Sequence, residues 1–155
     1  MGQKQCPHRS QPPRRVEPLD LSYLPERALV LLDSAPIIYI LEGHPRFGRF
    51  RPLFEAHGTG RLRFAVTTIA VAEVLTGPLQ NGEEALARRY RAILESWQLI
   101  ELNVDIAESA ARLRAAVRLR LADAVHAASA LAVNAAALVT HDRDFSRVRS
   151  LRIIS

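Results

Sequence analysis

The chain has 155 residues, 48% of them hydrophobic, which predicts one domain with a core of its own. Its 21 basic and 16 acidic side chains give a net charge of +5, which is compatible with nucleic-acid binding but does not by itself indicate it. The single cysteine, Cys6, excludes an intrachain disulfide framework. Since the sequence has neither an apolar stretch of membrane-spanning length nor a secretion signal, we expect a cytoplasmic protein without membrane contacts.

The beginning of the chain differs in composition from the rest. Residues 1–27 are rich in Pro, Gln and Arg and show no periodicity, which predicts a flexible basic tail. Within it, we expect the segment from Leu19 to Leu24 to pack loosely on the domain. The folded domain is predicted to cover residues 28–155.

The domain opens with an unbroken apolar run, Leu29–Leu32, that is followed by Asp33. A short run of this kind predicts a strand buried on both faces. Asp33 would then lie at the carboxyl end of a central strand, where open α/β sheets bind their ligands. Ser34 and Pro36 come next and predict a helix over residues 37–42, because proline is tolerated in a first helical turn.

Helical and strand patterns then alternate along the chain. Phenylalanines at helical spacing predict a helix within residues 45–57, and Gly77 with Pro78 predicts the end of a helix that begins at Ile69. The further predicted helices span 82–97, 104–118 and 121–133, and the further strands span 62–66, 99–102, 136–140 and 151–154. This alternation predicts an α/β fold in which a mainly parallel sheet is flanked by helices.

Four carboxylates occupy positions where a charged side chain is costly. Asp33 and Asp142 each follow a predicted strand, and Glu73 lies in the helix directly after the second strand, so these three are expected at one edge of the sheet. Asp123 begins an apolar helix that follows another helix, so topology alone places it less firmly. Each acid also has a purely structural interpretation, as a helix or turn cap, as a partner of a helix dipole, or as an ion-pair partner of an arginine.

Convergence of these acids would create mutual repulsion that raises their pKa values. A divalent cation removes that repulsion, and an all-oxygen ligand set suits Mg²⁺ or Mn²⁺. Such ions polarise a phosphodiester, activate a water and stabilise the leaving oxygen. Converging acids would therefore favour metal-dependent hydrolysis of a phosphodiester, with the metal charge and nearby arginines attracting a polyanion that acids alone would repel.

Four segments carry a resemblance to a known family. They are Leu32–Tyr39 (LDSAPIIY), Thr68–Leu75 (TIAVAEVL), Leu121–Leu131 (LADAVHAASAL) and Val139–Phe145 (VTHDRDF). In this order and at these separations they resemble the PIN-domain ribonucleases, and among these the VapC toxins of bacterial toxin–antitoxin pairs. The resemblance covers about residues 28–155 and leaves out the N-terminal tail, which departs from the usual pattern of such toxins.

The resemblance implies a PIN-like three-layer α/β/α sandwich and an endoribonuclease that uses Mg²⁺ or Mn²⁺ to activate water. It implies that the metal-binding and catalytic acids are Asp33, Glu73, Asp123 and Asp142. It also implies an RNA substrate, a cognate antitoxin as protein partner, and a homodimer.

Residues beside these acids are supporting or alternative candidates. By the resemblance, Ser34 would contact Asp33 or a metal-bound water, and Asp144 competes with Asp142 for the role of fourth acid. We favour Asp142 because it comes directly after the predicted strand and Thr140.

Basic and histidine side chains complete the candidate set. His126 and His141 adjoin two of the acids, and we expect packed or supporting roles for them rather than metal ligation. Candidates for contact with RNA phosphates are Arg114, Arg118 and Arg143, although arginines on a helix also commonly form a solvated face.

Three other functions stay open at this point. The first is a non-catalytic PIN-fold module that binds RNA or a protein. The second is a structure-specific DNA nuclease, which would share the acidic cluster. The third is a phosphatase-like hydrolase with Asp33 as its nucleophile.

Overall fold

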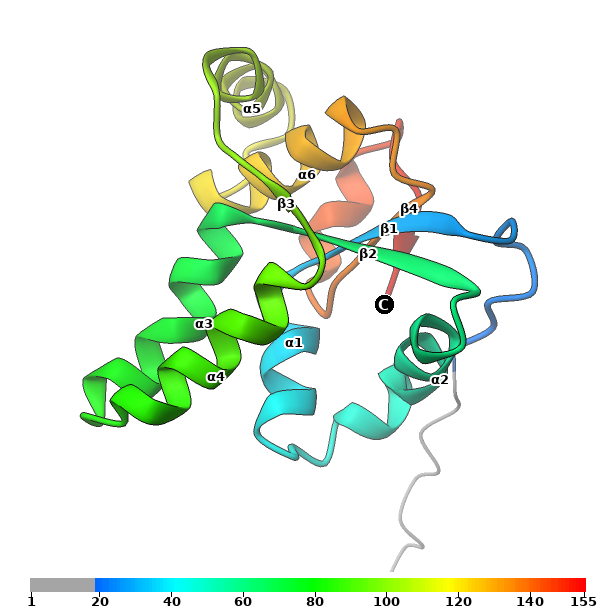
Figure 1. Cartoon of the computed structure of the whole chain (residues 1–155). Coiled ribbons are helices and arrows are strands. Elements are labelled where there is room, and N and C mark those ends of the chain that lie inside the picture. Colours follow the sequence, from blue (N-terminus) through cyan, green and yellow to red (C-terminus); the bar gives the residue numbers. More distant parts are fainter. Residues whose placement is uncertain (1–18) are drawn as a thin grey trace, which may run out of the picture.

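The computed structural model describes residues 19–155, so most of the predicted tail lies outside the described residues (Figure 1). Its strands are β1 (Ala28–Leu32), β2 (Leu62–Thr67), β3 (Gln98–Ile100), β4 (Ala137–Val139) and β5 (Ile153–Ile154). Its α-helices are α1 (Ser34–Leu41), α2 (Phe47–Gly58), α3 (Thr68–Gln80), α4 (Glu84–Glu95), α5 (Val104–Val117) and α6 (Leu121–Ala132). A short 3-10 helix, η1 (Arg143–Arg147), follows β4.

The strands form one five-stranded sheet in the order β3-β2-β1-β4-β5, and every neighbouring pair is parallel. β1 is the central strand, where Leu31 pairs with Ala65 of β2 on one side and Leu138 of β4 on the other. The predicted α/β class with a parallel sheet is therefore confirmed. Because all strands run the same way, their carboxyl ends meet at one edge, and any side chain just past a strand end is delivered there.

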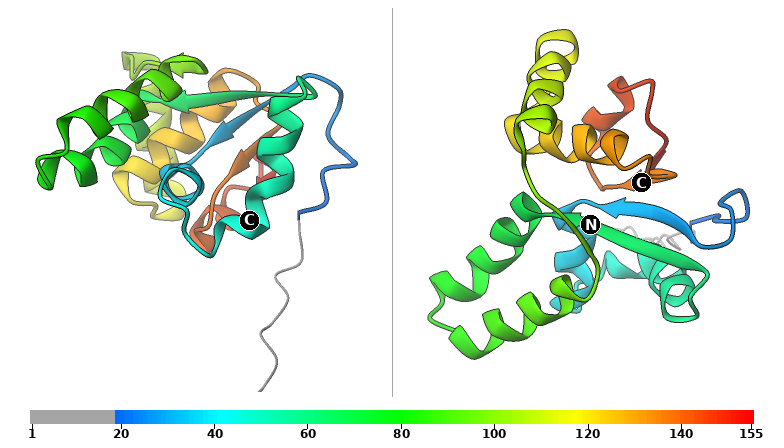
Figure 2. Two further views of the ribbon diagram at one scale, coloured as in Figure 1. Left: turned by 60° about the horizontal axis from the view of Figure 1, so that its bottom comes forward. Right: turned by 45° about the horizontal axis from the view of Figure 1, so that its top comes forward.

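Helices cover both faces of the sheet, which gives the three layers of an α/β/α sandwich (Figures 1 and 2). Side chains of β1 alternate between the two layers. Val30 and Leu32 belong to the core beneath α1, α2 and α3, whereas Leu29 and Leu31 belong to the core beneath α5 and α6. Burial on both faces explains why the β1 sequence is apolar at every position.

The packed part of the chain begins before residue 28. Leu21 and Leu24 are buried and join the core on the α1–α2 side, and the guanidinium of Arg61 donates to the backbone oxygen of Leu21. Residues 19–27 therefore contact the domain through these two leucines, while most other side chains of the segment are exposed, and the boundary at residue 28 stays a prediction. The prediction of a flexible tail for residues 1–18 concerns residues outside the described part.

Helix α3 extends past the predicted stop at Gly77 and Pro78 and ends at Gln80. Pro78 lacks the N–H that an interior residue would donate, but it stands in the last turn and its ring is buried. Gly82, with a φ of 72°, then turns the chain toward α4, a conformation that glycine adopts without strain.

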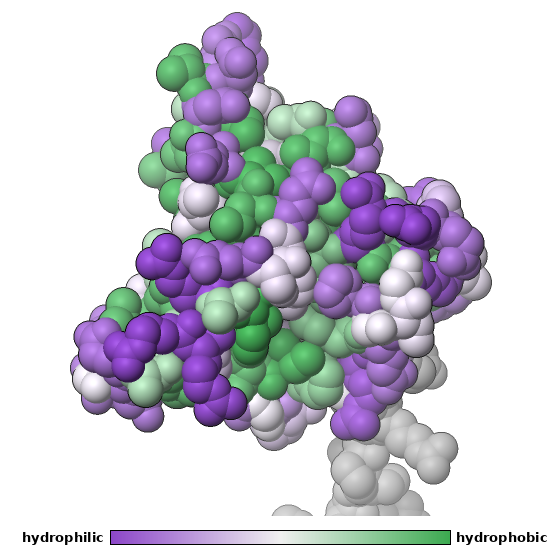
Figure 3. Space-filling view, viewed as in Figure 1, coloured by the Kyte–Doolittle hydropathy of each residue, from purple (hydrophilic) through white to green (hydrophobic). Residues whose placement is uncertain are grey.

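The surface combines hydrophilic and apolar regions. In the view of Figure 3, hydrophilic side chains gather toward the tip of the α3–α4 hairpin, and apolar surface lies toward the middle of the face. Exposed large apolar side chains in the described part include Leu99 in β3, Leu102 after it, and Val104 at the start of α5. Among residues 19–155, none of the helices is both long and apolar enough to cross a bilayer.

Candidate active site

A pocket of about 510 Å³ opens where β1 and β4 end. It is lined by Asp33, Ser34, Ala35, Tyr39, Glu73, Asp123, His141, Asp142 and Arg143. The four carboxylates singled out from the sequence thus line one pocket, although they come from four separate segments. None of them forms a salt bridge with an arginine of residues 19–155. A larger pocket, of about 650 Å³, lies between β3 and α5 and is lined by none of these four acids.

Hydrogen bonds fix both the backbone and the carboxylate of Asp33 at the end of β1. Its backbone N–H donates to the Val139 carbonyl of β4 at 2.9 Å, which ties it to the neighbouring strand. Its Oδ1 accepts the Ser34 N–H at 2.7 Å and so caps α1, and the Ser34 hydroxyl lies 3.4 Å from the same oxygen. Asp33 is only 7% exposed. The capping interpretation is therefore correct in geometry, and the cap also lines the pocket.

Thr140 connects two of the acids through a single hydroxyl. Its Oγ1 donates to Asp33 Oδ2 at 2.7 Å and accepts the Asp142 N–H at 2.9 Å. Thr140 is fully buried, so these bonds form away from water, where an unpaired polar group is costly. The end of β4 thereby fixes the backbone of Asp142 relative to the carboxylate at the end of β1.

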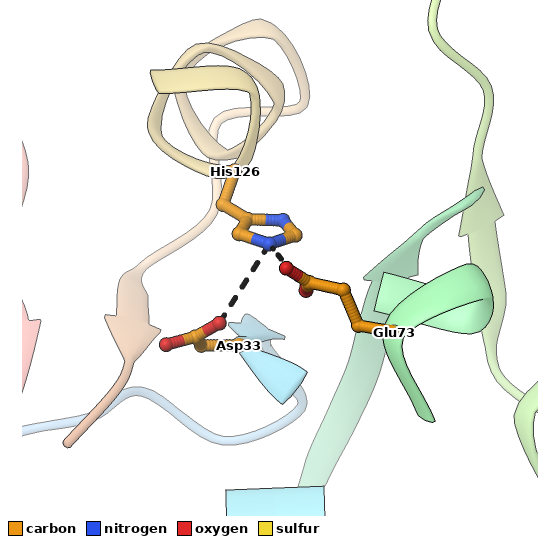
Figure 4. A group of neighbouring side chains, drawn as sticks. All are labelled: Asp33, Glu73 and His126. Carbon is orange, nitrogen blue, oxygen red and sulfur yellow. Dashed lines mark hydrogen bonds and ion pairs between the residues drawn. The ribbon is translucent and has the colours of Figure 1, made fainter. Parts of the chain in front are cut away.

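His126, in the second turn of α6, points its Nε2 between the carboxylates of Asp33 and Glu73 (Figure 4). Nε2 lies 3.3 Å from Glu73 Oε2 and 3.6 Å from Asp33 Oδ1. One atom of each of these three side chains lies within 4.8 Å of the other two, a spacing that could hold a metal ion. His126 is 1% exposed, whereas the Glu73 side chain is 38% exposed, so the glutamate reaches toward the open side of the pocket.

Thr67, at the end of β2, contacts the second ring nitrogen of His126. Its Oγ1 already accepts the Ala70 N–H at 3.0 Å, as the N-cap of α3, and lies 2.9 Å from His126 Nδ1. Because carboxylate oxygens only accept, the contacts with Glu73 and Asp33 favour a proton on Nε2, and the Thr67 hydroxyl then donates to Nδ1 of the neutral ring. His126 accordingly acts as a donor to the acids. Its hydrogen bond holds the pKa of Glu73 below the usual value, with a smaller contribution from Ser34, against the opposing effect of burial.

Asp123 stands in the first turn of α6, opposite these hydrogen-bonded acids. Arg118 ends α5 in the left-handed conformation, with φ of 57°, and the chain turns there so that α6 begins beside the pocket. Burial raises the pKa of Asp123, and the negative charges of Asp33 and Asp142 raise it further, while His126 and Arg120 oppose the shift. This repulsion is the effect expected when carboxylates converge without a counter-ion.

Comparison with known proteins identifies the fold family. The sequence matches the PIN domain over residues 30–151. This chain belongs to the PIN-domain family. A search of curated protein sequences gave no significant match.

Solved structures share this PIN fold at low sequence identity. A chain of a toxin–antitoxin complex from Klebsiella pneumoniae is 24% identical with a TM-score of 0.65, over 81% of this chain and 96% of that chain. A chain of VapBC2 from Rickettsia felis, solved with a DNA fragment from its promoter, is 20% identical with a TM-score of 0.66, over 81% and 97%. VapC20 of Mycobacterium tuberculosis, described as a toxin that cleaves the sarcin–ricin loop, is 15% identical with a TM-score of 0.63, over 77% and 94%.

Other candidate residues of this PIN domain divide between the pocket and its surroundings. Asp142 lines the pocket, whereas its rival Asp144 points to Arg147, with 3.0 Å between Oδ1 and the guanidinium. Asp142 Oδ1 also accepts the Asp144 N–H, so it caps η1 as the structural interpretation required. Arg143 lines the pocket.

Two of the three arginines proposed from the sequence do not line the acid pocket. Arg114 directs its Nε to the Leu119 carbonyl at 3.4 Å and so supports the turn after α5. Arg118 forms that turn. Their contacts favour a structural role over the phosphate contacts that the sequence suggested.

Sequence reasoning missed part of the pocket's surroundings. His126 was expected to be a packed or supporting residue, and it is buried, but its position between two acids required the α6 register to be known. The sequence makes Thr67 or Thr68 a plausible N-cap of the helix that follows the second strand, but it gives no sign of the contact between Thr67 and His126. Tyr39 and Arg46 carried no signal of their own, and Arg46 lies beside the pocket only because the α1–α2 turn brings it to His141, with 3.3 Å between Nη1 and Nε2.

Proposed function

We propose that this chain is an endoribonuclease that depends on Mg²⁺ or Mn²⁺ and serves as the toxin of a toxin–antitoxin pair. The observation that carries the proposal is the convergence of four carboxylates in one pocket of a PIN domain, with no arginine of the described residues paired to them. An acidic set of this kind fits a hard divalent cation, since hard cations prefer oxygen ligands.

The residues that would hold the cation are Asp33, Glu73, Asp123 and Asp142. Bound Mg²⁺ or Mn²⁺ supplies Lewis acidity, which withdraws charge from a phosphodiester and makes water more acidic. The protein supplies orientation: Thr140 and Ser34 hold the two oxygens of Asp33, and His126 holds Glu73. Asp123 and Asp142 line the same pocket and contribute the remaining carboxylates of the proposed ligand set.

The test is cleavage of a structured RNA in Mg²⁺ or Mn²⁺ by the wild type and by Asp33→Asn. We expect a loss of about a hundredfold or more, since metal-assisted charge stabilisation is worth several kcal/mol. Activity that is equal in the two proteins would exclude the role of Asp33. Cleavage in the presence of excess chelator would exclude the dependence on a metal.

Further measurements separate the competing functions. Single-stranded DNA and flap substrates run beside RNA would identify a DNA nuclease. A non-catalytic module predicts no heat on Mn²⁺ titration that depends on the acids. A phosphatase-like hydrolase predicts a phospho-aspartate at Asp33, but both oxygens of that side chain accept hydrogen bonds, which makes it a weaker nucleophile.

The proposed partners are an antitoxin and a second copy of the chain, in the cytoplasm. Antitoxin binding is suggested by the structural neighbours, which come from toxin–antitoxin complexes. A small DNA-binding protein encoded next to this gene should co-purify with the chain on co-expression. Self-association is supported by exposed apolar residues in the edge strand β3 and in the segment that follows it, above all Val104 at the start of α5, which is 81% exposed. Light scattering should show a dimer that Val104→Asp weakens, and a monomeric wild type would contradict this.

A further inference from the structure

One wall of the acid pocket continues into a group of aromatic and basic side chains. We call Tyr39, His44, Arg46, His141 and Arg143 the aromatic–basic ledge. Tyr39, His141 and Arg143 line the acid pocket, and His141 and Arg143 also line an adjoining pocket of about 150 Å³. The ledge is thus continuous with the wall of the acid pocket.

Contacts within the ledge hold it together without covering it. The Arg46 guanidinium donates to the Tyr39 hydroxyl at 3.3 Å and lies 3.3 Å from His141 Nε2. The rings of Tyr39 and His44 are stacked, with 4.8 Å between centroids and 25° between planes, and His141 meets the Tyr39 ring edge-on at 5.7 Å. His44, Arg46, His141 and Arg143 are nonetheless exposed.

The cations of the ledge have no acidic partner within the described chain. Arg61, Arg91, Arg112 and Arg147 each form a salt bridge with a nearby glutamate or aspartate. Arg46 and Arg143 form none among residues 19–155. Two guanidinium groups without a salt bridge, beside the exposed ring of His44 that stacks on Tyr39, suit a ligand that is both anionic and aromatic.

We propose that the ledge binds the nucleotide next to the scissile phosphate of a single-stranded RNA. Its base stacks on the Tyr39–His44 pair, and its phosphate is held by Arg46 and Arg143. This assignment rests on the proposed ribonuclease function, because it takes the acids as the position of the scissile phosphate. A duplex cannot offer an unstacked base, so the ledge selects RNA that is single-stranded or splayed open at this position.

The phosphate contacts are tested by fluorescence anisotropy with the full chain and a labelled single-stranded oligoribonucleotide of mixed sequence, in excess chelator so that it is not cut. Replacing Arg46 and Arg143 by Ala together should weaken binding about tenfold. It should also reduce the slope of log K against log salt by about 0.7 for each lost phosphate contact. The matched control replaces Arg91 and Arg112, whose salt bridges lie on α4 and α5, and should change affinity less than about twofold.

The stacking contact needs a separate variant and a ligand without bases. His44→Ala removes an exposed ring, and Tyr39→Phe keeps the stacked ring while removing the hydroxyl bonded to Arg46. His44→Ala should weaken RNA binding about fivefold or more and leave the binding of inorganic polyphosphate unchanged. An equal loss for both ligands would overturn the base contact. Tyr39→Phe should keep most of the affinity, and a loss as large as that of His44→Ala would count against stacking.

The two proposals fail in different ways. If the wild type cleaves RNA but the arginine variants bind it as well as the wild type does, the ledge assignment is wrong and the nuclease proposal stands. If the wild type cleaves nothing but the ledge variants lose RNA binding, the ledge stands as an RNA site and the nuclease proposal is wrong. Tighter binding of an acidic peptide than of RNA by the wild type would overturn the choice of ligand.

Discussion

The acid pocket has two halves that are held in different ways. In the inner half, Asp33 and Glu73 accept hydrogen bonds from Ser34, Thr140 and His126. In the outer half, the Asp123 carboxylate accepts no side-chain or capping hydrogen bond from residues 19–155, and the Asp142 carboxylate accepts one only from the Asp144 N–H of the turn that it caps. The pKa of Glu73 is accordingly lowered and that of Asp123 raised.

The two halves of the pocket therefore differ in what fixes their carboxylates. The inner acids are fixed by donors that the fold supplies, so their arrangement does not require a cation. The outer acids increase the negative charge of the pocket without a hydrogen-bond donor to compensate it, so their arrangement favours the binding of a cation. Variants that remove a donor should therefore destabilise the protein, whereas a variant that removes an outer charge should stabilise it until the cation is added.

The largest expected effect is that of Thr140→Val. The change keeps the shape of the side chain but removes the donor to Asp33 Oδ2 and the acceptor of the Asp142 N–H. We expect the free energy of unfolding to fall by about 3 kcal/mol, since one lost bond involves a buried charge. Urea denaturation at neutral pH measures it. Thr140→Ser keeps the hydroxyl and should lose much less, and an equal loss in both variants would contradict the assigned bonds.

A smaller effect is expected for Thr67→Val. The variant loses the cap of α3 and the partner of His126 Nδ1, which should lower the free energy of unfolding by about 1–2 kcal/mol. Nitrogen-15 NMR of the imidazole should find the proton of wild-type His126 on Nε2 and a mixture of tautomers in the variant. A wild-type proton on Nδ1 would contradict the hydrogen-bond assignment. Thr67→Ser serves as the control that keeps both bonds.

The smallest effect, and the only gain, is expected for Asp123→Asn. The pKa of Asp123 in the folded protein lies above its usual value of 3.8. As pH rises from 3.8 through the folded-state pKa, the contribution of Asp123 to stability therefore falls, and it stays unfavourable at higher pH. Removing the charge should therefore raise the free energy of unfolding at pH 7, by at most about 1 kcal/mol for a partly exposed group. Below pH 3.8 the gain should disappear.

Glu73→Gln should change the free energy of unfolding in the opposite direction to Asp123→Asn, which tests the difference between the two halves of the pocket. The pKa of Glu73 is lowered from 4.5, so its contribution is favourable above that pH and is lost as pH falls through the folded-state value. This variant should be less stable than the wild type at pH 7 in chelator. Thermal melts of both variants should then show a smaller rise with Mn²⁺ than the wild type, for which a concentration of 100 Kd gives about 2.7 kcal/mol. Unchanged metal response would contradict a shared site.

Sequence patterns predicted much of this fold because strand and helix periods are local properties. The apolar run before Asp33 and the strand before Thr140 placed two acids at the sheet edge through topology alone. The position of Asp123 could not be predicted from topology alone. The turn that brings α6 to the pocket depends on the left-handed conformation of Arg118, and no glycine in the sequence indicates such a turn. Helix α3 continues through Pro78, which is buried in the last turn, whereas the local pattern of glycine and proline predicts a stop. The contact between Thr67 and His126 joins residues 59 positions apart in the sequence, so it becomes visible only in the folded structure.

The backbone N–H of Asp33 donates to Val139, so the residue at the centre of the pocket is part of the ladder of the central strands. Hydrogen exchange at that amide should require global unfolding, whereas amides of exposed helix α4 should exchange through partial opening. The pocket would then keep its shape while the periphery loosens around it. A protein built in this way could remodel its outer helices for new contacts with little disturbance to its chemistry.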